Sequence, residues 1–249
     1  MGSKVKSILI SQPKPTSDRS PYFELAKKYK LKIDFRPFIH VEGIEAREFR
    51  KQRIQILDHT AVIFTSRHAV DHYFRLCEET RVSVPDSMKY FCISEAIAYY
   101  LQKYIVYRKR KIFHGKQTFA DLMDLIKKHK QETFLLPCSD ISKPSIPQML
   151  DEADIKYTQS IFYRTVASDL SDLSDVNYDM LVFFSPSGIR SLKENFPKFK
   201  QNLTRIAAFG TSTAKAVEDA GLKIDVHAPL PNYPSMSMAI EQYVKASNK

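Results

Sequence analysis

Hydroxyl side chains recur in this sequence where a short apolar stretch ends and a helical pattern begins. In an open parallel sheet, ligands bind at the carboxyl ends of the strands, where helix amino termini offer unpaired amides and a favourable dipole to anions. Helix capping alone would explain any single one of these residues. Four such strand ends facing a common cleft favour a polyanionic ligand rich in carboxylates. The positions are Ser66, Ser94, Ser185, Ser187, Thr211, Ser212 and Thr213.

Other kinds of chemistry have weaker support. His68 and His72 are four residues apart and could hold a metal from one helix face, but a surface pair is the preferred interpretation because no carboxylate motif lies near them. The sequence contains no phosphate-binding loop, no dinucleotide-binding glycine motif and no Gly-x-Ser-x-Gly elbow, and it has only six glycines. We therefore expect neither a metal site nor a nucleotide fold of the usual kind.

The chain of 249 residues carries a formal net charge of +10, which should attract an acidic partner. Its densest basic run, residues 104–111, is interpreted as a solvated edge strand or loop, since lysine and arginine discourage pairing at sheet edges. Basic and aromatic residues are not interleaved as they are in single-strand or RNA-binding modules, so we expect no nucleic-acid partner. No apolar run is long enough to span a bilayer, and we expect no membrane partner either.

The cysteine pattern indicates a reducing compartment. Cys77, Cys92 and Cys138 are odd in number and lack metal-ligand spacing, and the latter two lie in apolar runs, as buried thiols do. The first ten residues are too short and too charged for a signal peptide. We predict a cytoplasmic protein that acts as a monomer.

The elements that must position the hydroxyl residues form a repeat. Residues 61–70 and 180–189 both read as a short apolar β-run that breaks at a serine into a helix, and each is followed by a second such unit, at 90–98 and 206–214. Fully apolar runs followed by helical periodicity indicate parallel strands in βαβ units. Two similar α/β halves, and a cleft between them, are therefore predicted.

Two extended segments, 32–39 and 157–166, each precede one copy of the repeat, and Pro37 suits an edge or crossing strand. Such crossings predict a domain at 40–163 inserted into a discontinuous domain made of 1–37 and 167–249, with hinge crossings at 38–39 and 164–166. The fold class is α/β, with two similar flavodoxin-like parallel-sheet domains joined by these crossings. Strands are expected at 5–11, 61–65, 89–93, 105–113, 132–137, 180–184, 204–209 and 224–227, and helices at 21–29, 45–57, 67–79, 95–103, 117–130, 145–153, 187–195, 211–220 and 235–246.

The second half of the chain resembles the uroporphyrinogen-III synthase family. The resemblance is carried by Ser160-Ile-Phe-Tyr163-Arg-Thr165, by Phe183-Phe-Ser-Pro-Ser-Gly188 and by Ile206-Ala-Ala-Phe-Gly-Thr-Ser-Thr-Ala-Lys-Ala-Val217. The Phe-Thr-Ser-Arg-His-Ala-Val run of the first half is similar to the family's strand-to-helix turn. Ser11-Gln12-Pro13 departs from the usual Thr-Arg-Pro, and Ser94-Glu-Ala-Ile-Ala98 lacks the usual threonine.

The resemblance implies a cofactor-free lyase of haem biosynthesis. Such enzymes close hydroxymethylbilane, a linear tetrapyrrole polycarboxylate, while inverting its last ring. By this resemblance Tyr163 is the candidate catalytic residue. The candidate substrate-binding residues are Ser11, Lys14, Ser66, Arg67, Ser94, Ser139, Ser185, Ser187, Gly210, Thr211, Ser212 and Thr213. A two-lobed polyanion-binding protein of the same fold, without catalytic activity, is the alternative.

Overall fold

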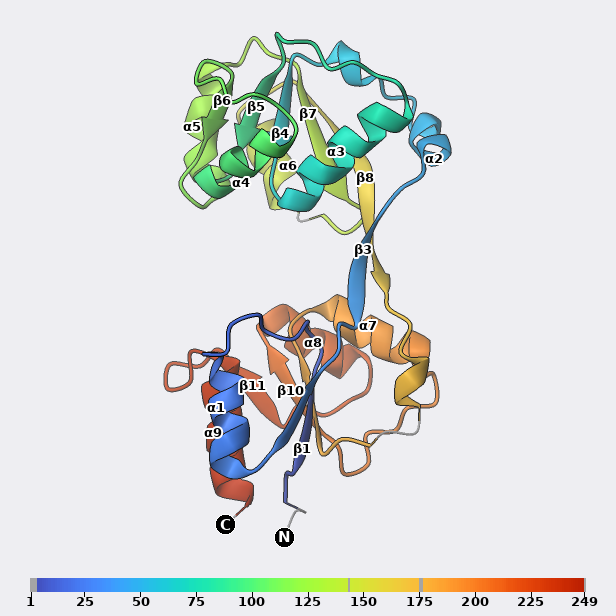
Figure 1. The fold of residues 1–249 in the computed structure, drawn as a ribbon, viewed down its shortest axis with the longest axis vertical. Helices are drawn as coiled ribbons and strands as arrows, with labels where there is room; N and C mark the ends of the chain where they lie inside the picture. Colours follow the sequence, from blue (N-terminus) through green and yellow to red (C-terminus); the bar gives the residue numbers. More distant parts are fainter. Residues whose placement is uncertain (1–3, 143, 175–176, 249) are drawn as a thin grey trace. The chain divides into compact units, whose positions relative to one another are not determined.

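The computed structural model describes residues 4–142, 144–174 and 177–248 and divides the chain into two compact units (Figure 1). Unit 1 comprises Met1–His40 and Val166–Lys249, and unit 2 comprises Val41–Thr165. Unit 2 is thus a continuous stretch of sequence that interrupts unit 1. Two strands carry the chain between them, β3 (Ile39–Gly43) and β8 (Tyr157–Ala167), and these are neighbours in one sheet.

Unit 1 is a five-stranded sheet with helices on both faces (Figure 1). The strand order is β11-β10-β9-β1-β2, and all four pairings are parallel. Its strands are β1 (Ser7–Ile10), β2 (Lys32–Phe35), β9 (Met180–Phe183), β10 (Arg205–Phe209) and β11 (Val226–Ala228), and its helices are α1 (Pro21–Tyr29), α7 (Pro186–Asn195), α8 (Thr211–Asp219) and α9 (Met236–Ser247), with a 3₁₀ turn at Ser171–Leu173.

Unit 2 has a sheet of order β3-β8-β7-β4-β5-β6, in which β8 to β6 pair in parallel. Besides β3 and β8, its strands are β4 (Ala61–Phe64), β5 (Lys89–Cys92), β6 (Ile112–His114) and β7 (Phe134–Ser139). Its helices are α2 (Ala46–Lys51), α3 (Arg67–Glu79), α4 (Glu95–Tyr100), α5 (Phe119–Lys128) and α6 (Ser145–Glu152), with 3₁₀ turns at Ile56–Asp58 and Leu101–Lys103.

The strand orders of the two sheets are related by a circular permutation. Numbered along the chain, the strands of unit 1 lie in the order 2-1-3-4-5, which is the flavodoxin-like order. The five parallel strands of unit 2 lie in the order 5-4-1-2-3, which is a circular permutation of the same arrangement. The predicted α/β class with parallel sheets is confirmed, and β4, β5 and β6 of unit 2 correspond to β9, β10 and β11 of unit 1.

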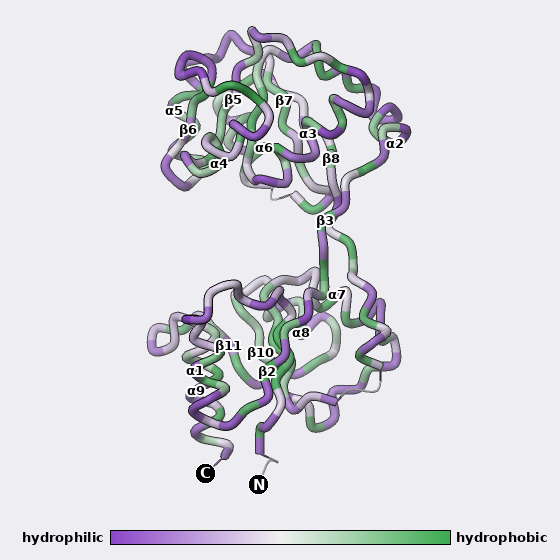
Figure 2. The backbone as a smooth tube through the Cα atoms, viewed as in Figure 1, coloured by the Kyte–Doolittle hydropathy of each residue, from purple (hydrophilic) through white to green (hydrophobic). Residues whose placement is uncertain are grey.

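Alternating side chains of the strands pack into two hydrophobic cores in each unit, one on each face of the sheet. Ile8 and Ile10 of β1 pack with α1 and α9, whereas Leu9 between them packs with α7 and α8. In unit 2, Val62 and Phe64 of β4 pack against α3 and α4, while Ala61 and Ile63 face α5 and α6. The hydropathy colouring in Figure 2 shows hydrophobic strand segments inside each unit.

Each sheet has a switch point, where the direction in which the chain adds strands reverses. In unit 1 the chain passes from β1 to β2 on one side and from β9 to β10 on the other, so the switch lies between β1 and β9. In unit 2 it lies between β7 and β4, and at both places the helices that follow the two strands lie on opposite faces of the sheet. A crevice forms outside the carboxyl ends of such strands, and it is the usual ligand position in open α/β sheets.

Three sequence expectations differ from the structure. The helix expected at 45–57 ends at Lys51 because Arg53 adopts φ 54° and the Gln52 side chain turns onto β8, where it bonds both the amide and the carbonyl of Ile161. The strand expected at 105–113 exists only as β6, so most of the basic run forms the loop before this edge strand. The extended segment 32–39 is divided, since β2 ends at Phe35 and β3 begins at Ile39.

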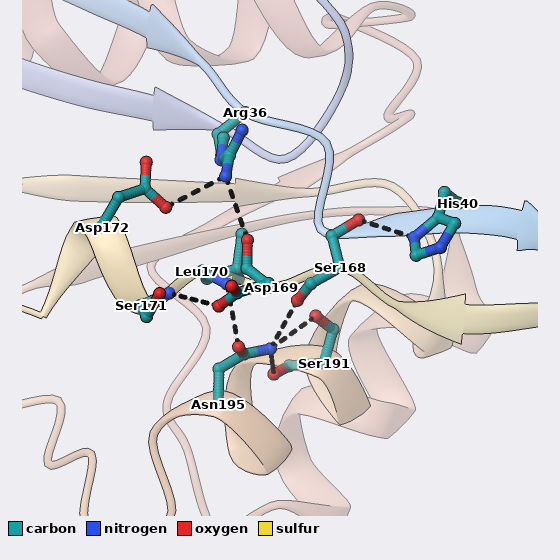
Figure 3. A network of polar contacts seen from close by, with 9 residues as sticks. All are labelled: Arg36, His40, Ser168, Asp169, Leu170, Ser171, Asp172, Ser191 and Asn195. Atoms are coloured by element: carbon teal, nitrogen blue, oxygen red, sulfur yellow. Dashed lines mark hydrogen bonds and ion pairs between the residues drawn. The ribbon is translucent and has the colours of Figure 1, made fainter.

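Within unit 1, a polar network ties down the segments that lead into β3 and out of β8 (Figure 3). Asn195, the last residue of α7, accepts the Leu170 amide through its side-chain oxygen and donates to the Ser168 carbonyl, both near 3 Å. Arg36 donates to the Asp169 carbonyl and to the Asp172 carboxylate, each at 3.0 Å. Both connecting segments are therefore held by side chains of unit 1 itself.

Within the described ranges, no helix combines the length and the apolar character needed to cross a membrane.

Candidate functional site

The switch point of unit 2 gathers several of the candidate residues. Ser66 follows β4 and is the N-cap of α3, where its hydroxyl accepts the Ala69 amide at 3.1 Å. Ser139 ends β7, next to β4, and is paired in register with Tyr163 of β8. Three residues that lie far apart in the sequence are thus brought to one sheet edge by parallel pairing.

Ser66 and Tyr163 form a hydrogen-bonded pair, with 3.1 Å between the two hydroxyl oxygens. Either hydroxyl can be the donor, so one of their two protons is shared between them and the other is left to point elsewhere. The Ser66 oxygen has two lone pairs and can accept from both Ala69 and Tyr163. In either orientation the pair therefore keeps one O–H that is not used between the two residues.

The environment of Tyr163 keeps its phenol neutral. Its side chain is only 8% exposed, and burial raises the pKa of the phenol above its usual value, an effect partly offset by the hydrogen bond to Ser66. A neutral phenol at physiological pH can donate a hydrogen bond or a proton but cannot serve as an anionic base. The arrangement suits a donor to a leaving oxygen.

Two histidines of α3 flank the Tyr163 ring. The His72 and Tyr163 ring centroids are 5.4 Å apart with the planes inclined at 24°, and the His68 ring lies at 6.2 Å. The i, i+4 spacing of these histidines is visible in the sequence, but their partner on β8 is not. Among the described residues no group of three or more metal-ligating side chains comes together.

Arg67 opens α3 beside this pair and is exposed. Its guanidinium lies over the Tyr100 ring, 5.2 Å from the centroid. The nearby carboxylate of Asp71 is already bonded by Tyr100, Tyr104 and Lys103, and these bonds lower its pKa against the opposing effect of burial. The positive charge of Arg67 thus remains available to an acidic ligand.

Ser139 and Ser94 differ in how far their hydroxyls are engaged. Ser139 donates to Asp140 at 2.8 Å and accepts the Ile141 amide at 3.3 Å, so both its roles are used locally. Ser94 has the extended backbone of an N-cap to α4, but its side chain makes no capping bond within the part of the chain that the structure describes. Its hydroxyl is the freer of the two.

The switch point of unit 1 is built in the same way. Ser185 follows β9 and caps α7 by accepting the Gly188 amide at 3.4 Å, and its φ and ψ of −154° and 154° are close to the −157° and 163° of Ser66. Ser11 follows β1. A Cβ built on Gly188 would lie 3.8 Å from the Ser11 hydroxyl and 3.9 Å from that of Ser185, so these two serines face one small region.

The start of α8 is shaped by Gly210. Its φ of 85° is a conformation that disfavours other residues, and a Cβ built there would meet no atom within 4 Å. Thr211 and Ser212 in the first turn are exposed, whereas Thr213 is only 1% exposed. Because its hydroxyl is buried, Thr213 contributes its backbone amide rather than its side chain to any ligand at this helix start.

Two of the basic residues of unit 1, Arg190 and Lys14, bear on anion binding because an anionic ligand needs positive charge. Arg190 of α7 donates to the Ser187 hydroxyl at 3.3 Å and is exposed, which places a charge at this helix start that the sequence patterns did not single out. Lys14 lies with its ammonium 6.0 Å from the Phe23 ring and lines a cavity of about 430 Å³ that also contains Asp34 and Arg36.

Comparisons with known proteins agree with the fold described above. A family model described as uroporphyrinogen-III synthase HemD matches residues 20–237. A uroporphyrinogen-III synthase from Chlorobaculum parvum is 24% identical over 260 residues, covering 97% of this chain and all of the relative, and one from Saccharomyces cerevisiae is 27% identical over 137 residues, about half of each chain.

Two solved structures share the fold. Uroporphyrinogen-III synthetase from Helicobacter pylori has a TM-score of 0.60 at 17% identity, and a mutant uroporphyrinogen III synthase from Thermus thermophilus has a TM-score of 0.51 at 15% identity. Each alignment covers 97% of this chain and 99% of the solved chain.

Proposed function

The chain belongs to the uroporphyrinogen-III synthase family, and from that premise we propose that it catalyses the cyclising dehydration of hydroxymethylbilane with inversion of the last pyrrole ring. It is then a lyase of tetrapyrrole and haem biosynthesis. The observation that carries this conclusion is the match of the family model to residues 20–237, which spans both units.

We propose that the Ser66–Tyr163 pair assists departure of the bilane hydroxyl. The O–H of the pair that is not used between the two residues donates its proton to that oxygen, the C–O bond breaks, and the hydroxyl leaves as water while the bilane becomes a protonated azafulvene. The substituted carbon of the last ring attacks this electrophile, and the resulting spiro intermediate fragments and recloses. The ring proton lost at the end returns to the pair, so the net loss is one molecule of water. General-acid assistance of this kind contributes about 10²- to 10⁴-fold.

The substrate carries many carboxylates, and we propose that the helix starts after the sheet strands bind them. Free amides at the first turns of α3, α7 and α8 supply hydrogen-bond donors and the positive end of each helix dipole. Supporting side chains in unit 2 are Ser66, Arg67 and Ser94. In unit 1 they are Ser11, Lys14, Ser185, Ser187, Arg190, Thr211 and Ser212, with Gly210 leaving room beside its backbone. Holding the reacting carbons together is the main requirement, because the bilane also closes unaided to the unrearranged isomer.

We further propose that the enzyme works in the cytoplasm as a monomer, without cofactor or nucleic acid. All three cysteines are free and buried, which suits a reducing compartment. The basic net charge is accounted for by the acidic substrate. Light scattering of the purified protein tests the monomeric state directly.

The test of the activity is a product analysis. Hydroxymethylbilane is supplied with and without the protein, and the type III and type I uroporphyrinogens are separated. We expect type III to exceed the protein-free background in proportion to protein concentration. An unchanged background of type I together with tight bilane binding would instead identify a binding protein. If the protein neither forms type III nor binds the bilane, the bilane is not its ligand.

A further inference from the structure

Of the two α3 histidines beside the Tyr163 ring, His72 is the one that stacks on it. His72 stacks on it with 5.4 Å between ring centroids and 24° between planes, whereas His68, one turn earlier, is inclined at 44° and is exposed. Tyr163 also packs among the buried residues of the α3 face of the sheet. Stacking by His72 restrains the phenol ring, and because a phenol O–H prefers to lie in the plane of its ring, that plane sets the direction of the hydroxyl beside Ser66.

Arg75 determines the orientation of the His72 ring. Its Nε donates to His72 Nδ1 at 3.3 Å, and a guanidinium has no acceptor, so Nδ1 must carry the lone pair and neutral His72 carries its proton on Nε2. Arg75 is itself fixed, because one Nη atom donates to the Ile44 carbonyl at 2.6 Å and the other to Glu79 at 2.5 Å. The imidazole therefore has one tautomer and one orientation.

Close packing against the backbone at the end of β3 completes this support. A Cβ built on Gly43 would lie 2.5 Å from Arg75 Nη2 and 2.6 Å from His72 Nδ1, both too short for any real contact. Gly43 is one of only six glycines in the chain, and its φ is not in the left-handed region. A side chain at residue 43 would have to displace the Arg75 guanidinium and the His72 ring from these positions.

We propose that His72 is a positioning residue for Tyr163, which stacks on the phenol and holds its hydroxyl against Ser66, and that Arg75 and Gly43 fix His72 for this role. The proposal rests on the function proposed above, since it concerns the donor of the leaving-group step. In this role His72 does not touch the substrate, and its effect on the reaction passes through Tyr163.

A double-mutant cycle on the full-length protein tests this dependence. We expect His72→Ala to lower kcat for type III formation roughly three- to tenfold, the range of an aromatic stacking contact, with little change in KM. In a Tyr163→Phe background, which has no hydroxyl to position, the same change should have little further effect on kcat. His72→Phe keeps a flat ring and should restore most of the activity, and His68→Ala should cost less than His72→Ala.

Equal losses from His72→Ala in both backgrounds would overturn the proposal, because they would show a general structural role. An unchanged kcat would overturn it as well. A readout independent of activity is the ring resonance of ring-labelled Tyr163, assigned by its loss in Tyr163→Phe. This signal should shift in His72→Ala and in Gly43→Ala, and a signal that stays in place in both variants would contradict the contact. If the wild type makes no type III product, the proposed function fails, while this spectrum still tests the positioning contact.

Discussion

At the scale of single residues, the candidate site of unit 2 combines a neutral donor, an exposed cation and two histidines around one sheet edge. Tyr163 and Ser66 share a hydrogen bond of 3.1 Å, and Arg67 lies over the ring of Tyr100, whose hydroxyl bonds the Asp71 carboxylate together with that of Tyr104. The family resemblance identified Tyr163 and the capping pattern identified Ser66. Their direct contact joins β8 to the start of α3, and no short-range pattern encodes it.

We predict that Arg67→Gln raises KM for hydroxymethylbilane roughly tenfold, the scale of one lost hydrogen bond to a charged group, with a smaller change in kcat. The helix start of α3 remains capped by Ser66, so stability should change little. Steady-state kinetics provide the measurement. Lys130→Gln is the matched control, because Lys130 is also exposed but is paired with Asp154 at 3.0 Å. An equal KM for both variants would remove Arg67 from the binding site.

His72 should make stability depend on pH. Burial and the Arg75 cation hold the pKa of the His72 imidazole below its ordinary value near 6.5. At a pH between the folded and the unfolded pKa of His72, the unfolded chain binds more protons than the folded chain. The contribution of His72 to the unfolding free energy is therefore fully present above about pH 6.5 and is lost as the pH falls through the folded pKa. Groups facing His72 are His68, Asp71, Arg75 and Glu79 on its own helix and Tyr163 from β8.

Urea unfolding between pH 7.5 and 5 measures this dependence. We expect the loss of stability over this range to be smaller in His72→Phe than in the wild type, because the substituted ring cannot take up a proton. Parallel curves for the two proteins would contradict the assignment of this pH dependence to His72.

At the scale of elements, the strand-to-helix turns were the most predictable parts of the chain. Four buried runs, β4, β5, β9 and β10, end shortly before α3, α4, α7 and α8, because the apolar pattern, the turn residue (serine before α3, α4 and α7, glycine before α8) and the following helical period all agree there. The helix expected at 45–57 was wrong in its second half, where the side chain of Gln52 bonds a strand more than a hundred residues away. Long-range bonds of this kind leave no local pattern.

Asn195 is the element-scale contact with the sharpest expected effect on stability. Its side chain accepts the Leu170 amide and donates to the Ser168 and Ser191 carbonyls, so Asn195→Ala removes one hydrogen-bond partner from each of these part-buried backbone groups (Figure 3). We predict a loss of about 1–3 kcal/mol in the unfolding free energy. Chemical denaturation measures it, with Gln131→Ala, an exposed site on unit 2, as the control. A loss no larger than that of the control would mean that the hydrogen bonds of Asn195 do not contribute measurably to the unfolding free energy.

At the scale of the whole molecule, the repeated strand order of the two units follows from the repeated sequence pattern, but its circular permutation does not. Sequence order alone cannot say whether β8 joins the edge next to β7 or another edge, because that choice is made by packing across the sheet. The same holds for the site. Hydroxyls at strand ends could be read from the sequence, whereas the burial of Thr213 and the stacking of His72 on Tyr163 depend on neighbours that only the fold supplies.

The net charge of +10 gives a prediction for the molecule as a whole. If carboxylates of the bilane are attracted by exposed bases, KM should rise as ionic strength increases from about 0.01 M to 0.15 M, because the screening length falls from about 30 Å to about 8 Å. Initial rates at fixed pH over a sodium chloride series provide the measurement. A KM that stays constant over this series would exclude capture by charge.

The measurement that tests the central claim most directly is the isomer-resolved rate of uroporphyrinogen formation by the wild type and by Tyr163→Phe, compared side by side. The substitution removes one hydroxyl and keeps the ring that packs on His72. We predict that the wild type produces type III well above the spontaneous type I background, and that the variant still produces type III but more slowly by about 10²-fold, the low end for general-acid assistance. A variant as fast as the wild type would contradict the role of the Ser66–Tyr163 pair, and a wild type that yields only type I would contradict the function itself.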